Sequence, residues 1–172
     1  DELYTLEPGD RLQCLGPLGK PFSIVEPPQR AWLVAGGVGL APFATLAEQL
    51  KTRGTDTTLF YGGRTKSDLY YVELFERLGV EVNLVTEDGS RGHKGRVTEP
   101  LEKRLLNSEA HSIMVYACGP TPMMHAVSTL ADKVNQQTEV SLEPVMGCGL
   151  GGCYSCVVRV VDGGSHFVRS CL

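Results

Sequence analysis

Residues 30–42 read RAWLVAGGVGLAP, and this stretch decides the fold of the chain. Residues 31–35 form an almost uninterrupted apolar run, which is typical of a strand in a parallel sheet that is covered on both faces. Glycines follow the run, and a helix is expected from Pro42, because proline is favoured at the start of a helix. The stretch therefore predicts a strand, a glycine-rich loop and a helix, which is the repeating unit of an α/β sheet.

The rest of the chain continues this alternation of strands and helices. Further strands are predicted from apolar runs at residues 57–61, 80–86, 113–117 and 139–142. Helices are predicted at residues 42–54, 97–106 and 122–135. Ser67 is expected to cap one more helix, whose buried face would be Tyr71, Leu74, Phe75 and Leu78. The sequence therefore predicts an α/β fold with a five-stranded, doubly wound parallel sheet.

Two of the predicted strands run into motifs that suit a nucleotide. After the first strand, Gly36, Gly37 and Gly39 would let the backbone approach a pyrophosphate, and the helix from Pro42 would present free amides to the anion. Pro42 stands where the usual dinucleotide fingerprint has its third glycine. A tight turn from strand to helix, without a ligand, is the alternative interpretation.

The fourth strand runs into the sequence CGPTPM at residues 118–123. Gly119 and Pro120 force a sharp exit, which would leave Cys118 at the tip of the strand, beside the crevice in which such sheets bind ligands. A buried cysteine that acts as a small apolar residue is the alternative. Taken together, the two motifs predict an NAD site that comprises Gly36, Gly37, Gly39, Pro42, Cys118, Gly119, Pro120 and Met123.

Four of the six cysteines lie near the end of the sequence, as Cys148, Cys153, Cys156 and Cys171. Their spacing is C-x4-C-x2-C-x14-C, and its first part is the spacing of plant-type 2Fe-2S centres. Several glycines separate the first cysteines and suit a loop that must turn its amides inward. The pattern therefore predicts that these four cysteines hold a 2Fe-2S cluster.

A β-hairpin is predicted to bring the last cysteine back to the other three. Residues 157–161 and 166–170 read as strands, and Gly163 and Gly164 between them are typical of the centre of a hairpin turn. Counting from that turn places Cys156 directly opposite Cys171, with their Cβ atoms about 5 Å apart.

Two other roles of the cysteines compete with a cluster. A structural zinc site is one, although zinc ribbons usually have two C-x2-C knuckles and this chain has one. A disulfide framework is the other, and it fits poorly because six cysteines are few for 172 residues. Iron and sulfide analysis separates these alternatives.

Composition narrows the function further. The chain of 172 residues has 16 Lys and Arg against 20 Asp and Glu, a formal net charge of -4, without a basic run, so we expect no nucleic acid partner. Apolar stretches are far shorter than the roughly 20 residues that span a bilayer, so we expect no membrane insertion and a cytoplasmic location.

We expect the chain to have three parts: residues 1–29, 30–143 and 144–172.

The first part is expected to be the end of another domain. Leu3 to Leu6 and Arg11 to Leu15 read as short strands, with Cys14 packed in the second, and residues 25–29 read as a linker. Two short strands need partners for a stable sheet.

The two nucleotide motifs and residues 143–156, closed by Cys171, resemble one known family. It is the electron-transfer subunit of the NAD-linked, class 1B dihydroorotate dehydrogenases, within the ferredoxin reductase superfamily. The resemblance implies that Cys148, Cys153, Cys156 and Cys171 hold a 2Fe-2S cluster and that the glycine and Cys118 motifs line an NAD site. It also implies a heterotetramer with an FMN-containing catalytic subunit, and it assigns no catalytic residue to this chain.

The resemblance further implies a route for electrons: from dihydroorotate through FMN to the cluster, then FAD, then NAD, in pyrimidine biosynthesis. The Arg-x-Tyr-Ser motif and the Gly-Thr contact of the family's FAD barrel do not occur here, so residues 1–29 resemble the remnant of that barrel. Because a flavin must divide the hydride electron pair, we expect that the chain alone does not move electrons between NADH and the cluster. The alternatives are a flavoprotein iron-sulfur reductase subunit for ferredoxin, hydrogenase or a sulfur substrate that uses NAD or NADP, and a non-enzymatic zinc-binding module with four cysteine ligands.

Overall fold

A computed structural model of the chain describes residues 2–109, 111–161 and 165–172. Its contacts divide the chain into two compact units. One unit comprises residues 22–142, and the other combines residues 1–21 with residues 143–172. The larger unit holds both nucleotide motifs and the smaller unit holds the four C-terminal cysteines. The part limits predicted from sequence, 1–29, 30–143 and 144–172, stay predictions.

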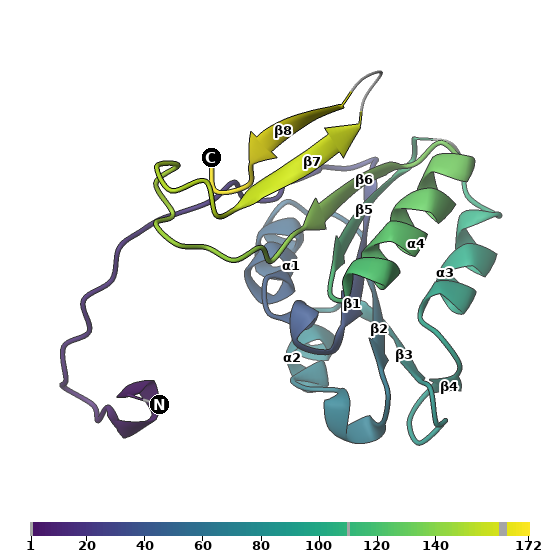
Figure 1. The fold of residues 1–172 in the computed structure, drawn as a ribbon. Coiled ribbons are helices and arrows are strands. Elements are labelled where there is room, and N and C mark those ends of the chain that lie inside the picture. Colours follow the sequence, from purple (N-terminus) through teal and green to yellow (C-terminus); the bar gives the residue numbers. More distant parts are fainter. Residues whose placement is uncertain (1, 110, 162–164) are drawn as a thin grey trace. The chain divides into compact units, whose positions relative to one another are not determined.

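The larger unit is built on one parallel sheet (Figure 1). In the described residues its strands are β1 (Arg30–Gly36), β2 (Thr57–Gly63), β3 (Glu81–Thr86), β4 (His93–Lys94), β5 (Ile113–Cys118) and β6 (Gln137–Ser141). Their order across the sheet is β4-β3-β2-β1-β5-β6, and every pair is parallel. The doubly wound fold predicted from sequence is confirmed. The sheet has six strands instead of five, because two residues at His93–Lys94 pair with the end of β3.

Helices cover both faces of this sheet (Figure 1). They are α1 (Phe43–Thr52), α2 (Val72–Arg77), α3 (Thr98–Leu105) and α4 (Thr121–Lys133). Alternate residues of β1 enter opposite cores: Leu33 packs with apolar residues of α1 and α2, whereas Trp32 and Val34 pack with those of α3 and α4. This double burial explains why residues 31–35 are apolar without alternation.

The predicted helix near Ser67 begins later than expected. Thr65, not Ser67, provides the cap, and it caps the 3-10 turn η3 (Lys66–Asp68) through a reciprocal bond with Asp68. The α-helix α2 begins only at Val72, after Tyr71 in a left-handed conformation with φ of 52°. Tyr71 is 76% exposed, so its expected place on the buried face was wrong. Phe75 is buried as predicted.

The predicted strands before residue 22 are not formed. Within residues 2–29 the structure has the 3-10 turn η1 (Glu2–Thr5) and no strand, and Cys14 is exposed. A strand needs hydrogen-bonded partners, and none of the described residues pairs with this segment. Residues 25–29, expected as a linker, belong to the larger unit, and Val25 packs against its core.

The smaller unit contains the predicted C-terminal hairpin of β7 (Val157–Val161) and β8 (Ser165–Arg169). The predicted turn at Gly163 and Gly164 lies outside the described residues. The predicted register is wrong by one residue, because Val157 pairs with Arg169 and Val161 with Ser165. Cys156 is therefore next to Ser170, whose amide donates to the Cys156 carbonyl at 3.2 Å, and Cys171 follows one residue later.

The packing of α3 can be tested with one pair of leucines. Leu101 is fully buried on the sheet, whereas Leu106, just after the helix, is 69% exposed. We expect Leu101→Ala to lower the free energy of unfolding by about 2–5 kcal/mol, because it leaves a cavity in the core. Leu106→Ala is the matched control, with an expected change within about 0.5 kcal/mol. Equal melting temperatures of the two variants would contradict this packing.

Candidate functional site

The two nucleotide motifs meet at the carboxyl ends of β1 and β5. These strands are neighbours, and Ala35 of β1 pairs with Cys118 of β5, so Gly36 and Gly119 leave the sheet side by side. The order in which the chain adds strands to the sheet reverses at this point. From β1 the chain continues to β2, β3 and β4 on one side, and β5 and β6 lie on the other side of β1. Open α/β sheets bind ligands in the crevice at such a reversal.

The glycines of the two motifs allow the loops to approach closely. A Cβ atom on Gly36 would lie 2.8 Å from Pro120 Cδ and 2.8 Å from Met123 Sδ. A Cβ atom on Gly39 would lie 2.3 Å from the Cys118 carbonyl oxygen. These distances are too short for any side chain, so the two loops can pack against each other only while both positions stay glycine.

Gly37 has a different role in the same loop. Its φ of 56° is left-handed, and a Cβ atom there would meet nothing within 4 Å. Glycine is therefore needed for the backbone conformation and not for packing. The adjacent Val38 is 73% exposed, so this part of the loop faces open space, as a ligand-binding loop must.

The structure brings most of the predicted NAD residues together. Gly36, Gly39, Cys118, Gly119, Pro120 and Met123 lie in mutual contact. Pro42 comes after the 3-10 turn η2 (Gly37–Leu40) and directly precedes α1. The Cys118 side chain is buried in the core beneath the loop, as in the alternative interpretation, and only its backbone contacts Gly39. That these residues line an NAD site stays a prediction.

One residue of this edge was missed in the sequence. Tyr61, in β2, is fully buried, and its hydroxyl contacts the Gly37 carbonyl oxygen at 3.1 Å. Its position in an apolar strand gives no signal of this contact, because Tyr is also an ordinary core residue.

The cysteine loop of the smaller unit is organised around two sulfur atoms. The amides of Leu150 and Cys153 donate to Cys148 Sγ at 3.3 and 3.4 Å. The Ser155 hydroxyl lies 3.1 Å from Cys153 Sγ and accepts a hydrogen bond from the Gly147 amide at 2.8 Å. Hydrogen bonding by Ser155 lowers the pKa of Cys153 to about 6, which favours the thiolate that binds a metal.

Glycine and arginine shape this loop. Gly149 and Gly151 have left-handed φ values of 67° and 79°, as the glycine-rich spacing predicted. Arg169 of β8 donates to the Gly151 carbonyl at 2.6 Å and lies over the Tyr154 ring at 5.2 Å. Arg169 and Ser155 were missed in the sequence, although both lie between or beside cysteines of the motif. Arg169 joins the loop to the hairpin, and Ser155 joins Gly147 to Cys153 within the loop.

Cys156 and Cys171 form a second, buried pair. The Cys171 thiol donates to Cys156, which lowers the pKa of Cys156 and raises the pKa of Cys171. The Ser170 hydroxyl also donates to the Cys156 carbonyl, at 3.0 Å. The hairpin therefore returns the last cysteine to the others, even though its register differs from the prediction.

The four cysteines lie in one unit and interact through their sulfur atoms. Hydrogen bonds join Cys148 with Cys153 and Cys156 with Cys171, and the charge of Cys148 also acts on Cys171. A 2Fe-2S cluster takes four cysteine ligands, two for each iron, and the amides directed at Cys148 suit a cluster-bound sulfur. All six cysteines are free in the structure.

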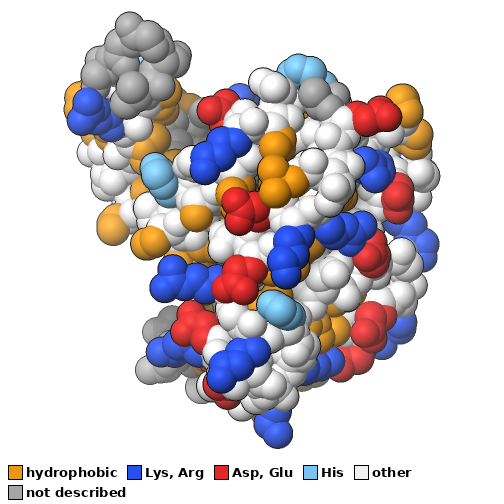
Figure 2. Space-filling view, turned by 90° about the vertical axis from the view of Figure 1, so that its right-hand side faces the viewer, with side chains coloured by type: hydrophobic (Ala, Val, Ile, Leu, Met, Phe, Trp, Pro, Cys, Tyr) orange, Lys and Arg blue, Asp and Glu red, His pale blue; other side chains and the backbone are white. Residues whose placement is uncertain are grey.

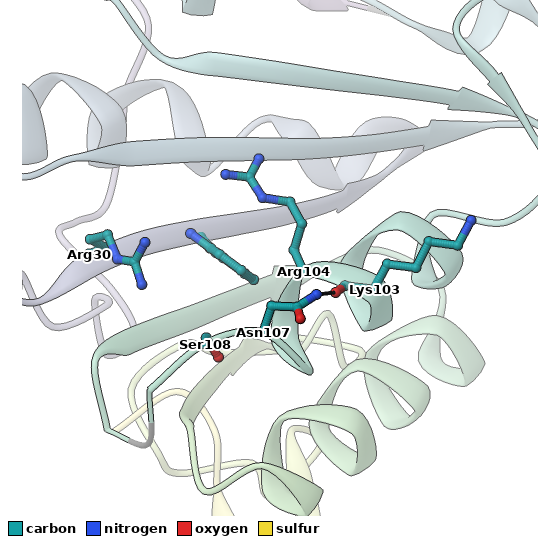
Figure 3. Close-up of a pocket in the computed structure, with 6 residues that line it drawn as sticks. Arg30, Lys103, Arg104, Asn107 and Ser108 are labelled. Atoms are coloured by element: carbon teal, nitrogen blue, oxygen red, sulfur yellow. Dashed lines mark hydrogen bonds between the residues drawn. The ribbon is translucent and has the colours of Figure 1, made fainter.

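A separate pocket of about 410 Å³ lies at the opposite end of β1 (Figure 3). It is lined by Arg30, Trp32, Lys103, Arg104, Asn107 and Ser108. Arg104 is engaged by Glu81 through bonds of 2.6 and 3.0 Å and covers the Trp32 ring at 5.2 Å. Figure 2 shows Lys and Arg side chains among Asp and Glu over the face of α3 and α4, so this face carries both signs of charge.

Comparison with known families agrees with the two sites. Residues 33–129 match the family model of the oxidoreductase NAD-binding domain. Residues 143–172 match the iron-sulfur cluster binding domain of dihydroorotate dehydrogenase B. The chain therefore carries an NAD-binding oxidoreductase domain followed by an iron-sulfur domain, in place of the zinc module considered above.

Similar whole proteins share one name. The chain is 40% identical over 172 residues to the electron transfer subunit of dihydroorotate dehydrogenase B (NAD(+)) from Bacillus caldolyticus, covering 98% of this chain and 64% of the relative. It is 37% identical to the subunit of the same name from Desulforamulus reducens, covering 92% of this chain and 60% of that protein. The chain belongs to the oxidoreductase NAD-binding domain family and is similar to these electron transfer subunits, whose cofactors are NAD, FAD and a 2Fe-2S cluster. It spans just under two thirds of the length of these relatives.

Solved structures share the fold. An NADH-dependent reduced ferredoxin-NADP oxidoreductase matches with a TM-score of 0.77 and 34% identity, covering 98% of this chain and 59% of that one. The cytochrome P450 reductase of Amycolatopsis matches with a TM-score of 0.58 and 22% identity, covering 73% of this chain and 43% of that one, and supports the fold alone. Within the described residues, no helix has the length and apolar character required to cross a bilayer.

The close approach of the two loops predicts a strong effect of one methyl group. Gly39→Ala would drive its Cβ atom into the Cys118 carbonyl and separate the loops, so we expect NADH binding to weaken about tenfold or more. Gly79→Ala is the control: Gly79 also resists substitution, with φ of 79°, but follows α2 in open space. Fluorescence titration with NADH measures both variants. Equal affinities would contradict a nucleotide site at these loops.

Single serine substitutions test the cluster ligands. We expect Cys148→Ser, Cys153→Ser, Cys156→Ser and Cys171→Ser each to reduce bound iron and acid-labile sulfide severalfold, because oxygen replaces a thiolate ligand. Cys14→Ser is the control, since Cys14 is exposed and outside the loop. A protein that contains one zinc and no sulfide would contradict the cluster, as would full iron in all four variants.

Proposed function

We propose that this chain is the NAD-binding and cluster-binding part of an electron-transfer subunit. In the complete enzyme, electrons from dihydroorotate oxidation would pass by way of the FMN of a catalytic partner, a 2Fe-2S cluster and FAD to NAD, in pyrimidine biosynthesis. The observation that carries this proposal is the presence of both a dihydroorotate-type cysteine loop and a glycine-rich nucleotide edge in one chain. The names of the relatives support the same assignment.

The residues of the chain would serve the two ends of this route. Cys148, Cys153, Cys156 and Cys171 would hold the cluster, which supplies one-electron transfer when bound. The two amides that donate hydrogen bonds to Cys148 Sγ would stabilise negative charge on that sulfur. At the other end, Gly37 would allow a pyrophosphate to approach the backbone, and the packed loops of β1 and β5 would hold the site in shape.

A flavin is required between these two ends. NADH gives up two electrons together as hydride, whereas the cluster accepts one electron at a time, and a flavin divides the pair. Neither flavin-binding motif of the family occurs in these 172 residues. We infer that the chain by itself does not connect NADH to its cluster, and that no residue of it performs the chemistry of dihydroorotate oxidation.

The partner and the location follow from the same proposal. An electron-transfer subunit requires a catalytic subunit, for which we propose the FMN-containing dihydroorotate dehydrogenase, assembled with it as a heterotetramer. We propose a reducing, cytoplasmic location, because six cysteines are few for a disulfide framework of 172 residues.

A reductase subunit for ferredoxin is a second candidate function. The match to an NADH-dependent reduced ferredoxin-NADP oxidoreductase, with 34% identity over nearly the whole chain, favours it specifically. The similar electron transfer subunits favour the dihydroorotate enzyme instead, at 40% identity. The two candidates differ in the electron donor that reduces the cluster.

Anaerobic reduction of the cluster tests both the route and the donor. We expect dihydroorotate to bleach the visible absorbance of the cluster only when the FMN-containing catalytic subunit is added, because that subunit oxidises the substrate. NADH alone should leave the absorbance unchanged, since no flavin divides its electrons. Dithionite is the positive control.

Other outcomes have clear meanings. Rapid bleaching by NADH without flavin would show that the chain is sufficient for electron transfer. Bleaching by reduced ferredoxin, together with no response to dihydroorotate and the catalytic subunit, would favour the second candidate.

A further inference from the structure

The buried hydroxyl of Tyr61 joins the loops that follow β1 and β2. It lies 3.1 Å from the Gly37 carbonyl oxygen, 3.0 Å from the Asp68 carbonyl oxygen and 3.1 Å from the Tyr70 amide nitrogen. Gly37 belongs to the glycine loop, whereas Asp68 and Tyr70 belong to the segment before α2. One side-chain atom therefore contacts three backbone groups from two separate loops at the carboxyl edge of the sheet.

A phenol hydroxyl cannot fully satisfy all three groups at once. It accepts the hydrogen bond from Tyr70 N–H, but it has a single proton to donate, so the Gly37 and Asp68 carbonyls share that proton. Burial raises the pKa of Tyr61, which keeps the hydroxyl protonated and able to donate at neutral pH. The Tyr61 hydroxyl thus links the Gly37 peptide to the segment before α2.

Both linked loops have unusual backbone conformations. Gly37 has a left-handed φ of 56°, and Tyr71, next to Tyr70, has a left-handed φ of 52° without being glycine. Such a conformation costs an aromatic residue free energy, and it persists only when the surroundings hold it in place. The bond from Tyr70 N–H to Tyr61 is one of the contacts that holds it.

The network extends to the loop after β3. The Asp88 amide donates to the Arg64 carbonyl at 3.1 Å, and the Lys66 amide donates to the Ser90 hydroxyl at 2.8 Å. The segment that Tyr61 joins to the glycine loop is therefore itself attached to the neighbouring strand end. The loops after β1, β2 and β3 form one hydrogen-bonded unit at the edge where Gly37 faces open space.

We propose that Tyr61 is a positioning residue for the dinucleotide, which orients the Gly37 peptide so that the glycine loop fits a pyrophosphate. This inference rests on the NAD site of the proposed function. Tyr61 does not contact the ligand in this account. It acts through Gly37, whose carbonyl direction determines the direction of the adjacent amide that would meet the phosphate.

The alternative is that Tyr61 only fills the core, and Tyr116 provides a matched comparison. Tyr116, in β5, is also fully buried and lies in the same core cluster as Tyr61. Its hydroxyl likewise donates to a backbone carbonyl, that of Ser23 at 2.9 Å, but Ser23 is not in a nucleotide loop. Tyr61→Phe and Tyr116→Phe therefore remove the same group from equivalent surroundings, with a different consequence for the glycine loop.

The test measures NADH affinity and thermal stability of both variants in the full 172-residue chain with its cluster. We expect Tyr61→Phe to weaken NADH binding about tenfold, because the Gly37 carbonyl loses its donor, which corresponds to about 1.4 kcal/mol. Tyr116→Phe should lower the melting temperature similarly and leave the affinity within about twofold. The iron content and the visible spectrum should not change in either variant.

Each outcome decides the proposal. Equal NADH affinity of Tyr61→Phe and the unaltered chain would overturn it, as would equal losses in both variants. If the unaltered chain does not bind NADH, the NAD site of the proposed function fails together with the role of Tyr61. If the unaltered chain binds NADH and Tyr61→Phe binds it equally well, only the role of Tyr61 fails.

A measurement on the unaltered chain covers the case in which Tyr61→Phe does not fold. NADH binding should shift the amide resonance of Tyr70, which donates to the Tyr61 hydroxyl, while the amide of Leu59 inside β2 should remain unchanged. A Tyr70 resonance that does not move at saturating NADH would overturn the coupling.

Discussion

The contact of Gly39 with the backbone of Cys118 is the constraint on which the nucleotide edge depends. Parallel pairing of β1 with β5 brings the two strand ends together, but two loops can leave neighbouring strands without clashing only if side chains are absent between them. Gly36 and Gly119 meet the same requirement against Pro120 and Met123. The glycine motif is therefore first a packing motif. Among the glycines of the first loop, Gly37 has open space where a Cβ atom would lie, and there we propose that a ligand approaches.

The same edge shows how a buried polar group can serve a surface loop. Tyr61 fills the core on one face of the sheet, and its hydroxyl reaches the carboxyl edge, where two backbone segments need a partner. Unpaired polar groups are costly in a protein interior. The loops are therefore held in the conformation in which the Tyr61 hydroxyl forms hydrogen bonds with their backbone groups. In our proposal, the buried Tyr61 hydroxyl thus orients the glycine loop without contacting the ligand.

The iron-sulfur loop reaches its shape by other means. Its conformation depends on left-handed glycines, on Ser155 between two cysteines, and on Arg169, which donates to the loop from β8. Hydrogen bonds to sulfur hold Cys148 and Cys153 as one pair, and the hairpin delivers Cys171 to Cys156 as the other. One pair within the loop and one pair at the base of the hairpin would suit a cluster of two irons, whose charge the nearby amides would stabilise.

The sequence by itself determined the doubly wound sheet, its helices, the two nucleotide motifs and the four cysteines, because apolar periodicity and cysteine spacing are local patterns. Tertiary structure alone decided the rest. The hairpin register differs by one residue because pairing across strands is not written in the spacing of residues 157–170. Tyr71 is exposed because Thr65 begins a separate 3-10 turn, the Tyr61 hydroxyl accepts from the Tyr70 amide after it, and α2 begins only at Val72. Strands expected before residue 22 require partners that a local pattern cannot supply. The role of Tyr61 is invisible in sequence for the same reason, since its three partners come from two loops that only folding brings together.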